Sequence, residues 1–169
     1  DSANAELNKL LSRGGISSMA YTIALILSAT AFGGISEKTG SVKAFLALVL
    51  SQVKTARGII TGTLCSAFGL NFIVADQYLS IVLPGRMYAE SFDNMNLAPE
   101  MLSRSLEDSG TVTSVLCPWN SCGAYMAATL GVATLDYLPF AFFNLLMPVI
   151  AIFYAWFGLF IIEKEAANV

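Results

Sequence analysis

The sequence predicts an all-α polytopic membrane protein. Apolar residues make up 56% of the 169 residues and charged residues only 12%, which is roughly half the charged share of a typical soluble domain. The charges are also unevenly spread. Asp76 is the only formal charge in residues 58–85. Asp136 is the only one in residues 109–162. A soluble chain needs charges over its whole surface, so we expect one membrane domain made of helices.

The first third of the chain predicts three successive elements. Residues 1–15 mix charged and apolar positions and indicate an amphipathic segment. Residues 16–36 contain about twenty residues without a charge, the length that crosses the hydrocarbon at about 1.5 Å per residue. Residues 41–56 are apolar for only about a dozen positions and carry lysines near both ends, which predicts a short or tilted helix with snorkelling side chains.

The middle of the chain predicts a broken transmembrane segment and then a loop. Residues 58–85 are long and apolar, with Asp76 inside them and Pro84-Gly85 at their end. An isolated acid within an apolar stretch marks a functional position in a membrane protein, and we expect the helix to break near it. Residues 86–106 are rich in charged and amide side chains and are expected to form a polar loop outside the membrane.

Residues 107–132 predict a discontinuous helix that carries a binding site. The run from Glu107 to Tyr125 reads EDSGTVTSVLCPWNSCGAY and gathers acids, hydroxyls and an amide among apolar neighbours. Polar groups at membrane depth persist only where they are buried in protein or line a cavity. Gly110, Pro118 and Gly123 supply positions where a helix can break. Residues 137–162 then form a further transmembrane helix.

Several functional classes are excluded by composition. With no histidine and a net charge of −3, the chain has no basic face for nucleic acid and no imidazole for metal binding. The three cysteines, Cys65, Cys117 and Cys122, match neither a zinc nor a redox spacing. We find no nucleophile and base pair and no phosphate loop. An enzyme is therefore not expected, and no cofactor is required.

Five ordered motifs carry a family resemblance. They read RGGISS from Arg13, FGGI from Phe32, DQYLSIVLPGRM from Asp76, LEDSGTVTS from Leu106 and PWNSCGAY from Pro118. Together they resemble the C-terminal part of the NhaC family of sodium/proton antiporters. The resemblance implies the second half of an inverted-repeat transporter, a partner half that precedes it in the whole protein, and a multi-pass location in a bacterial plasma membrane.

The resemblance and the chemistry of sodium together suggest the site residues. Sodium is a hard cation that prefers oxygen ligands, and we expect them from five residues: Thr111, Thr113, Ser114, Asn120 and Ser121. Exchange with a proton needs a carboxylate that holds either species. Asp76 and Asp108 are the candidates, so sodium and the proton would compete at them within the membrane.

Other interpretations of these residues stay open. Glu107 and Asp108 could instead form an acidic helix turn paired with Arg104, and the hydroxyls could be interhelical hydrogen bonds. Arg86 suits either a carboxylate substrate or a snorkelling position, and Trp119 suits either a gate or packing. The alternatives at the level of function are an organic-acid antiporter of the malate and lactate type, or a non-transporting membrane subunit; a homo-oligomer also stays open.

Overall fold

The structure is a computed structural model that describes residues 17 and 19–164, and its regular elements there are all helical. The all-α prediction is therefore confirmed for this part of the chain. The helices, in order, are α3 (Ala20–Lys38), α4 (Ser41–Ser51), α5 (Ala56–Ile73), α6 (Gln77–Asn94), α7 (Pro99–Leu106), the π-helix η1 (Glu107–Thr111), the 3-10 helix η2 (Ser114–Leu116), α8 (Ser121–Leu130), α9 (Thr134–Tyr137), the 3-10 helix η3 (Leu138–Phe140) and α10 (Phe142–Phe157).

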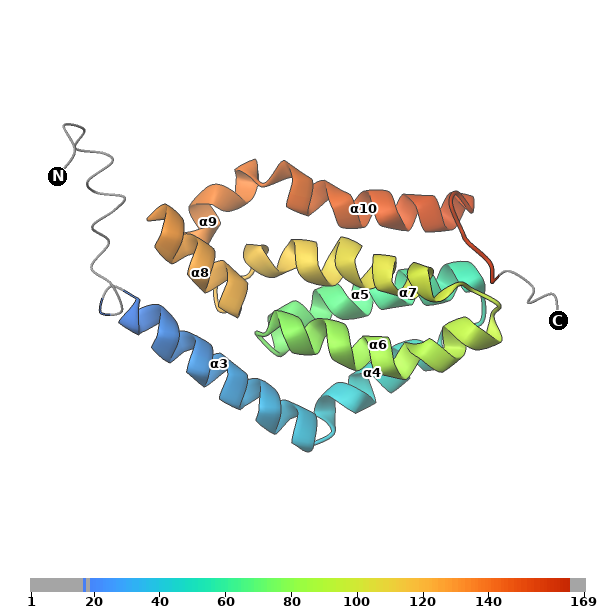
Figure 1. Ribbon diagram of the computed structural model, residues 1–169, viewed down its shortest axis with the longest axis horizontal. Coiled ribbons are helices and arrows are strands. Elements are labelled where there is room, and N and C mark those ends of the chain that lie inside the picture. The colour runs from blue at the N-terminus through green and yellow to red at the C-terminus, as the bar shows by residue number, and fades with distance from the viewer. Residues whose placement is uncertain (1–16, 18, 165–169) are drawn as a thin grey trace.

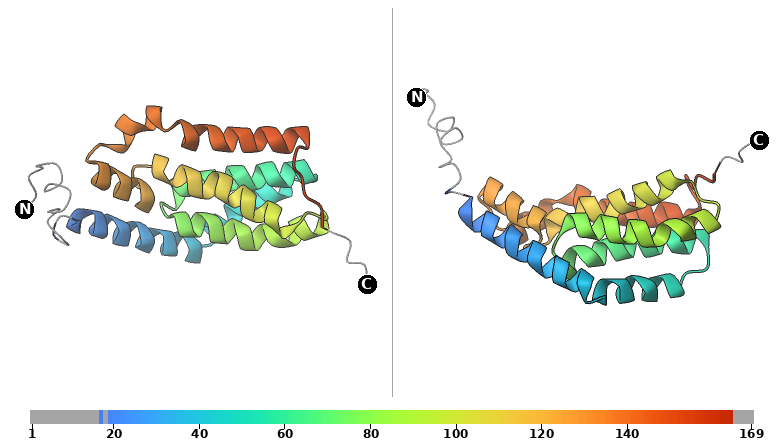
Figure 2. Two further views of the ribbon diagram at one scale, coloured as in Figure 1. Left: turned by 45° about the horizontal axis from the view of Figure 1, so that its top comes forward. Right: turned by 60° about the horizontal axis from the view of Figure 1, so that its bottom comes forward.

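Helix α5 is the centre of the bundle. It contacts α4, α6, α7, η1 and α10, which run alongside it in the views of Figures 1 and 2. Its apolar side chains Ile59, Leu64 and Leu70 are almost completely buried. The hydroxyl of Tyr88 on α6 is hydrogen bonded to Ser66 of α5 at 2.7 Å and donates to a carbonyl oxygen of α4 at 3.3 Å. These contacts hold α5 in place between its neighbouring helices.

Residues 58–85 form parts of two antiparallel helices rather than one broken span. Helix α5 ends at Ile73, and α6 starts at Gln77 and runs back beside it (Figure 1). In the turn between them Ala75 has a left-handed φ of 60°. Asp76 caps the new helix by accepting a hydrogen bond from the backbone N–H of Leu79 at 3.1 Å. Such a cap favours the start of a second helix, and α6 then continues through Pro84 to Asn94.

The structure is helical over most of residues 86–106, where we expected a polar loop with a short helix. Helix α6 occupies this stretch as far as Asn94, and α7 begins at Pro99. The polar residues lie on the exposed faces of amphipathic helices: Glu90 of α6 is exposed, whereas Tyr88 and Phe92 on the same helix are buried. Polarity therefore marked one face of each helix and did not mark a loop.

Most of the remaining elements differ from the expected ranges at their ends, but residues 137–162, expected as one helix, are divided into η3 and α10. Helix α3 is the one single helix in the described part of the chain that is long and apolar enough to cross a membrane; α9–η3 and α10, bent by 59° at their junction, would together make a second. Helix α4 ends at Ser51, and it begins after Gly40, which has a φ of 77°. The expected amphipathic segment at residues 1–15 lies outside the described residues.

Candidate functional site

The polar run that begins at Glu107 folds into three unlike pieces. Helix α7 passes into the π-helix η1, then into the 3-10 helix η2, and Cys117–Asn120 have no helical hydrogen-bonding pattern. We call Cys117–Asn120 the interruption. Pro118 within it has no N–H to donate. Asn120 caps α8 by accepting a hydrogen bond from the N–H of Cys122 at 3.0 Å. The sequence therefore ends one helix and starts the next within four residues.

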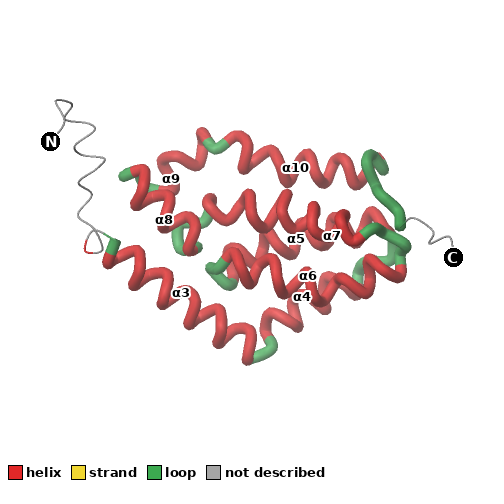
Figure 3. The backbone as a smooth tube through the Cα atoms, in the orientation of Figure 1, coloured by secondary structure: helices red, strands yellow, loops and turns green. Residues whose placement is uncertain are grey.

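The interruption and the first residue of α8 cover the C-terminal end of α5. The side-chain amide of Asn120 donates to the carbonyl oxygen of Asn71 at 3.2 Å, and the indole N–H of Trp119 donates to that of Phe72 at 2.9 Å. The backbone N–H of Ser121 donates to the carbonyl oxygen of Ala75 at 3.2 Å. The last carbonyls of a helix have no partner within it. Here Trp119 and Asn120 provide one for Phe72 and Asn71. Figure 3 shows the loop that contains the interruption beside the turn between α5 and α6.

Asn71 lies beneath this junction and joins it to the π-helix. Its Nδ2 donates to the carbonyl oxygen of Gly110 at 2.6 Å and to Oγ1 of Thr113 at 3.1 Å. Thr113 in turn donates to the carbonyl oxygen of Ser109 at 2.6 Å. Asn71, Thr113 and Asn120 are all completely buried. Helix α5 and the stretch from the π-helix to the interruption, which are 39 to 49 positions apart in sequence, therefore share one buried network of amides and hydroxyls.

Gln77 and Asp76 extend the network toward the surface. Oε1 of Gln77 accepts from Oγ of Ser114 at 3.1 Å and from Sγ of Cys122 at 2.6 Å. Asp76 is half-buried and, together with Gln77 and Ser121, lines an open pocket of about 360 Å³. The Oγ1 of Thr111 is buried and has no hydrogen-bond partner among the described residues.

The charge and ligand types of this cluster suit a hard monovalent cation. Asp76 supplies one carboxylate, and the groups around it are neutral amides, hydroxyls and carbonyls, the oxygen ligands that hard cations prefer. Asp76 makes no ion pair with another described residue, and it stands at the N-terminus of α6, where the helix dipole favours a negative charge. No cluster of three acidic, cysteine or histidine side chains occurs in residues 17 and 19–164.

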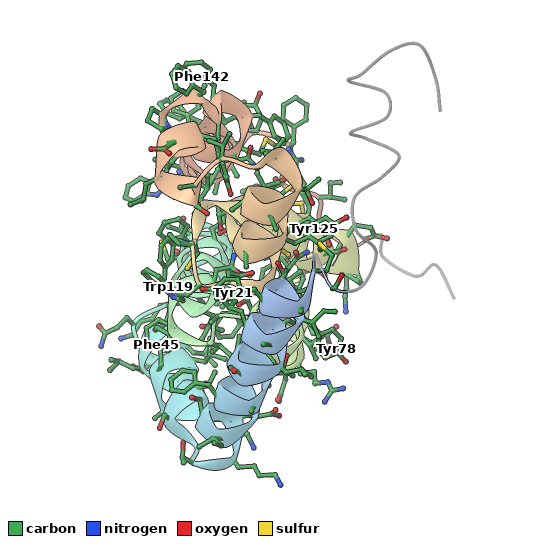
Figure 4. The ribbon with its side chains drawn as sticks, turned by 90° about the vertical axis from the view of Figure 1, so that its left-hand side faces the viewer. Tyr21, Phe45, Tyr78, Trp119, Tyr125 and Phe142 are labelled. Atoms are coloured by element: carbon green, nitrogen blue, oxygen red, sulfur yellow. The ribbon has the colours of Figure 1, made fainter. Side chains whose placement is uncertain are left out.

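The structure does not bring every expected site residue together. Oδ2 of Asp108 lies 3.4 Å from Nε of Arg104, one turn away, and the pair lines a small cavity against α10. Arg86 is exposed and lies ten residues along α6 from Asp76, about 15 Å at the helical rise. Trp119 is 52% exposed and packs edge-on against Phe72. In the end-on view of Figure 4, Trp119 and Tyr78 lie on either side of α3.

The sequence did not single out Asn71 and Gln77 as site residues, although both flank the predicted break. Asn71 is the one amide in residues 58–75. A lone amide in an apolar helix is a usable signal, because a buried amide needs partners. Its partner Gly110 is 39 positions away, so the signal could mark the residue without identifying its contacts.

Comparison with known proteins finds similar sequences that are named as antiporters. A profile of the Na+/H+ antiporter family matches residues 2–159. The chain is 40% identical over 149 residues to the Na(+)/H(+) antiporter NhaC of Bacillus subtilis, covering 88% of this chain and 33% of that protein. It is 35% identical over 166 residues to the Na(+)/H(+) antiporter NhaC of Alkalihalophilus pseudofirmus, covering 98% and 36%.

A third relative carries a different name. The chain is 37% identical over 155 residues to the malate-2H(+)/Na(+)-lactate antiporter of Bacillus subtilis, covering 92% of this chain and 33% of that protein. The chain thus spans about a third of the length of the curated relatives it matches. No solved structure matches it.

Proposed function

The chain belongs to the Na+/H+ antiporter family, and on that basis we propose that the complete protein exchanges sodium ions for protons across a membrane. In this proposal the chain is the C-terminal part of a multi-pass transporter, and the polypeptide that precedes it supplies the opposing half. The interruption is the break of a discontinuous transmembrane helix, the kind of element that forms ion sites in inverted-repeat transporters.

The observation that carries the proposal is the capping of α5 by the interruption. The turn before Asp76 accepts a hydrogen bond at Ala75 from Ser121, the first residue of α8, and the last turn of α5 accepts one at Asn71 from Asn120 of the interruption. Carbonyl oxygens have two lone pairs, so the capped carbonyls of α5 retain acceptor capacity for a cation. Asp76 borders this point from a pocket that opens outward.

The exchange itself needs one group that binds either ion. We assign that role to Asp76. When sodium is bound, the carboxylate neutralises it, and oxygens of Thr111, Thr113, Ser114, Asn120 and Ser121 provide further ligands. When sodium leaves, a proton takes its place on the carboxylate. The site therefore carries no unpaired charge when it changes access from one side of the membrane to the other, where such a charge would be costly. Asp108 is the second carboxylate of the proposal, and because it pairs with Arg104 we expect it to contribute less to the exchange than Asp76 does.

The test uses the complete protein in proteoliposomes with a sodium gradient and a lumenal pH dye. Asp76→Asn should abolish sodium-driven proton movement, because the amide cannot titrate or neutralise the ion. The fold should persist, because asparagine caps a helix as well as aspartate does. Asp108→Asn should reduce the rate and leave measurable exchange. Wild-type exchange by the Asp76 variant would remove this residue from the mechanism.

A second function is kept because of Arg86. Its exposed guanidinium makes no ion pair with another described residue, and a free guanidinium binds carboxylates bidentately. The relative named for malate and lactate makes organic acids the relevant substrates to test. The same vesicles loaded with malate or lactate decide the matter. Proton movement that requires the organic acid and is lost in Arg86→Gln would replace plain cation exchange.

A further inference from the structure

We propose that Asn71 is a positioning residue for sodium binding: it holds the π-helix and the N-terminus of α8 in the one arrangement that binds the ion. This inference rests on the proposed function and deepens it. Asn71 does not need to touch the ion. Its effect would be transmitted by the backbone and side-chain oxygens to which it is hydrogen bonded.

The hydrogen bonds of Asn71 leave its orientation no freedom. Thr113 uses its hydroxyl proton on the carbonyl oxygen of Ser109, so it can only accept the proton that Asn71 offers. The second N–H of Asn71 goes to the carbonyl oxygen of Gly110. With both donors used toward η1, the side-chain oxygen is directed to the other side, where Nδ2 of Asn120 lies 3.4 Å away.

The geometry makes Asn71 the residue that contacts both the π-helix and the interruption. On one side it holds Gly110 within the π-helix, a helix type that is rare and is found often at functional sites. On the other side its Oδ1 lies 3.4 Å from Nδ2 of Asn120, the residue that caps α8. The bond from Asn120 to the backbone carbonyl of Asn71 does not depend on the Asn71 side chain. A change of the Asn71 side chain therefore affects the π-helix and the interruption at once, whereas a change at Thr113 or Asn120 affects mainly one of them.

The π-helix that Asn71 contacts is tightly packed at Gly110. Gly110 packs so closely that a Cβ there would lie 3.0 Å from Ile81 of α6 and 3.4 Å from Ala67 of α5. The π-helix is therefore in direct contact with both helices of the hairpin. If Asn71 loses its amide, the carbonyl oxygen of Gly110 and the amide of Asn120 become buried groups with fewer partners, and the segments must shift to satisfy them.

Asn144 offers a matched control. Its Nδ2 also donates to a carbonyl oxygen of the same stretch, that of Val112, and also at 2.6 Å. It stands on α10, however, and lines an apolar pocket that includes neither Asp76 nor the interruption. Asn71→Ala and Asn144→Ala thus remove the same kind of hydrogen bond from neighbouring carbonyls, and only the first also removes a contact with the interruption.

The experiment compares both variants with wild type in the complete protein. The first readout is the apparent KM for sodium in proteoliposomes, measured at several pH values. We expect Asn71→Ala to raise KM by about tenfold, the effect of one lost buried hydrogen bond, with a smaller change in maximal rate. At a fixed sodium concentration the rate should reach half its maximum at a higher pH, because a weaker ion competes less well with the proton. Asn144→Ala should change none of these.

The second readout does not depend on transport. Sodium that binds the folded protein raises its Tm in detergent, and this sodium-dependent rise should be lost in Asn71→Ala and kept in Asn144→Ala. If Asn71→Ala does not fold, Asn71→Ser decides, because its hydroxyl can restore one of the two donated hydrogen bonds; its KM should lie between those of wild type and the expected alanine value.

The outcomes separate the two proposals. A wild-type protein that neither exchanges protons nor gains stability with sodium would overturn the proposed function. A functional wild type with equal sodium KM and pH profile in Asn71→Ala and Asn144→Ala, or a wild-type KM in Asn71→Ser, would overturn the role of Asn71 alone and leave the antiporter proposal standing.

Discussion

Thr111 shows how a single hydroxyl can separate packing from ion binding. Its Oγ1 is buried without a partner in the described part of the chain, whereas Oγ of Ser114 on the same stretch contacts both Gln77 and the carbonyl oxygen of Thr111. A buried unsatisfied hydroxyl costs about 1–3 kcal/mol. The two residues are alike in sequence and different in what their hydroxyls already do.

We predict that Thr111→Val and Ser114→Ala behave differently without sodium and alike with it. Valine keeps the shape of threonine and removes the unsatisfied group, so the Tm without sodium should stay or rise. Ser114→Ala deprives Gln77 of a donor and should lower the Tm. Both should weaken apparent sodium affinity more than maximal rate, because Asp76 is intact. Unchanged affinity in both variants would assign the hydroxyls to packing.

At the same scale, the sequence located one end of the network and missed the other. Asp76, Ser114, Asn120 and Ser121 were singled out by their isolation or by the density of polar residues, and the structure brings them to one junction. Asp108 was chosen by the same reasoning and lies apart with Arg104. Which face of the helix a residue occupies depends on the π-helix, and a local change of helical pitch is not visible in a residue pattern.

Among the elements, α8 depends on a close approach at Gly123. A Cβ at this position would collide with the carbonyl oxygen of Cys117, in the interruption itself. Only glycine lets the first turn of α8 lie against the chain that precedes it. Gly34 in α3 is the useful contrast, because a Cβ there would meet nothing within 4 Å.

We predict that Gly123→Ala destabilises the protein by about 1–3 kcal/mol, the usual cost of overpacking, and lowers exchange because α8 is displaced from the end of α5. Gly34→Ala should be neutral or slightly stabilising, since alanine is favoured over glycine by about 0.5–1 kcal/mol within a helix. Thermal denaturation of both variants in detergent measures the difference. Equal Tm values would show that the interruption can shift to accommodate the added methyl group.

The expected and the observed helix ranges are closest where polarity and length favour the same element. Residues 16–36 were expected as a helix, and α3 covers most of them. The hairpin of α5 and α6 was not foreseen, because Asp76 reads equally well as an intramembrane break or as a helix cap. In the structure the Asp76 side chain accepts a hydrogen bond from the N–H of Leu79 and so caps α6. A residue pattern does not show such a bond.

For the whole molecule, we predict that residues 1–169 alone enter membranes but do not exchange ions. The chain spans about a third of the relatives it matches, and the site proposed around Asp76 faces an open pocket and not an opposing wall. Alternating access requires a second element to move against the first. Proteoliposomes with the short chain, a sodium gradient and a lumenal pH dye give the test, with the complete protein as positive control.

A short chain that exchanges ions robustly would contradict this and point to a homodimer in which Asp76 is supplied twice. Cross-linking in the same membranes would reveal that assembly. A short chain that does not exchange but self-associates would be explained by its exposed polar groups seeking partners in lipid.

The hairpin of α5 and α6 also bears on biogenesis. Helix α3 is long and apolar enough to cross a membrane, so we expect it to insert by itself. Helix α6 carries Arg86 and Glu90 and begins at Asp76, and a charged residue near the centre of a lone helix disfavours insertion by about 2.5–3.5 kcal/mol. Tyr88 of α6 forms its buried hydroxyl contact with Ser66 of α5. We therefore expect α5 to remain at the translocon until α6 has been synthesised to its end at Asn94, so that the two helices enter the bilayer as a pair.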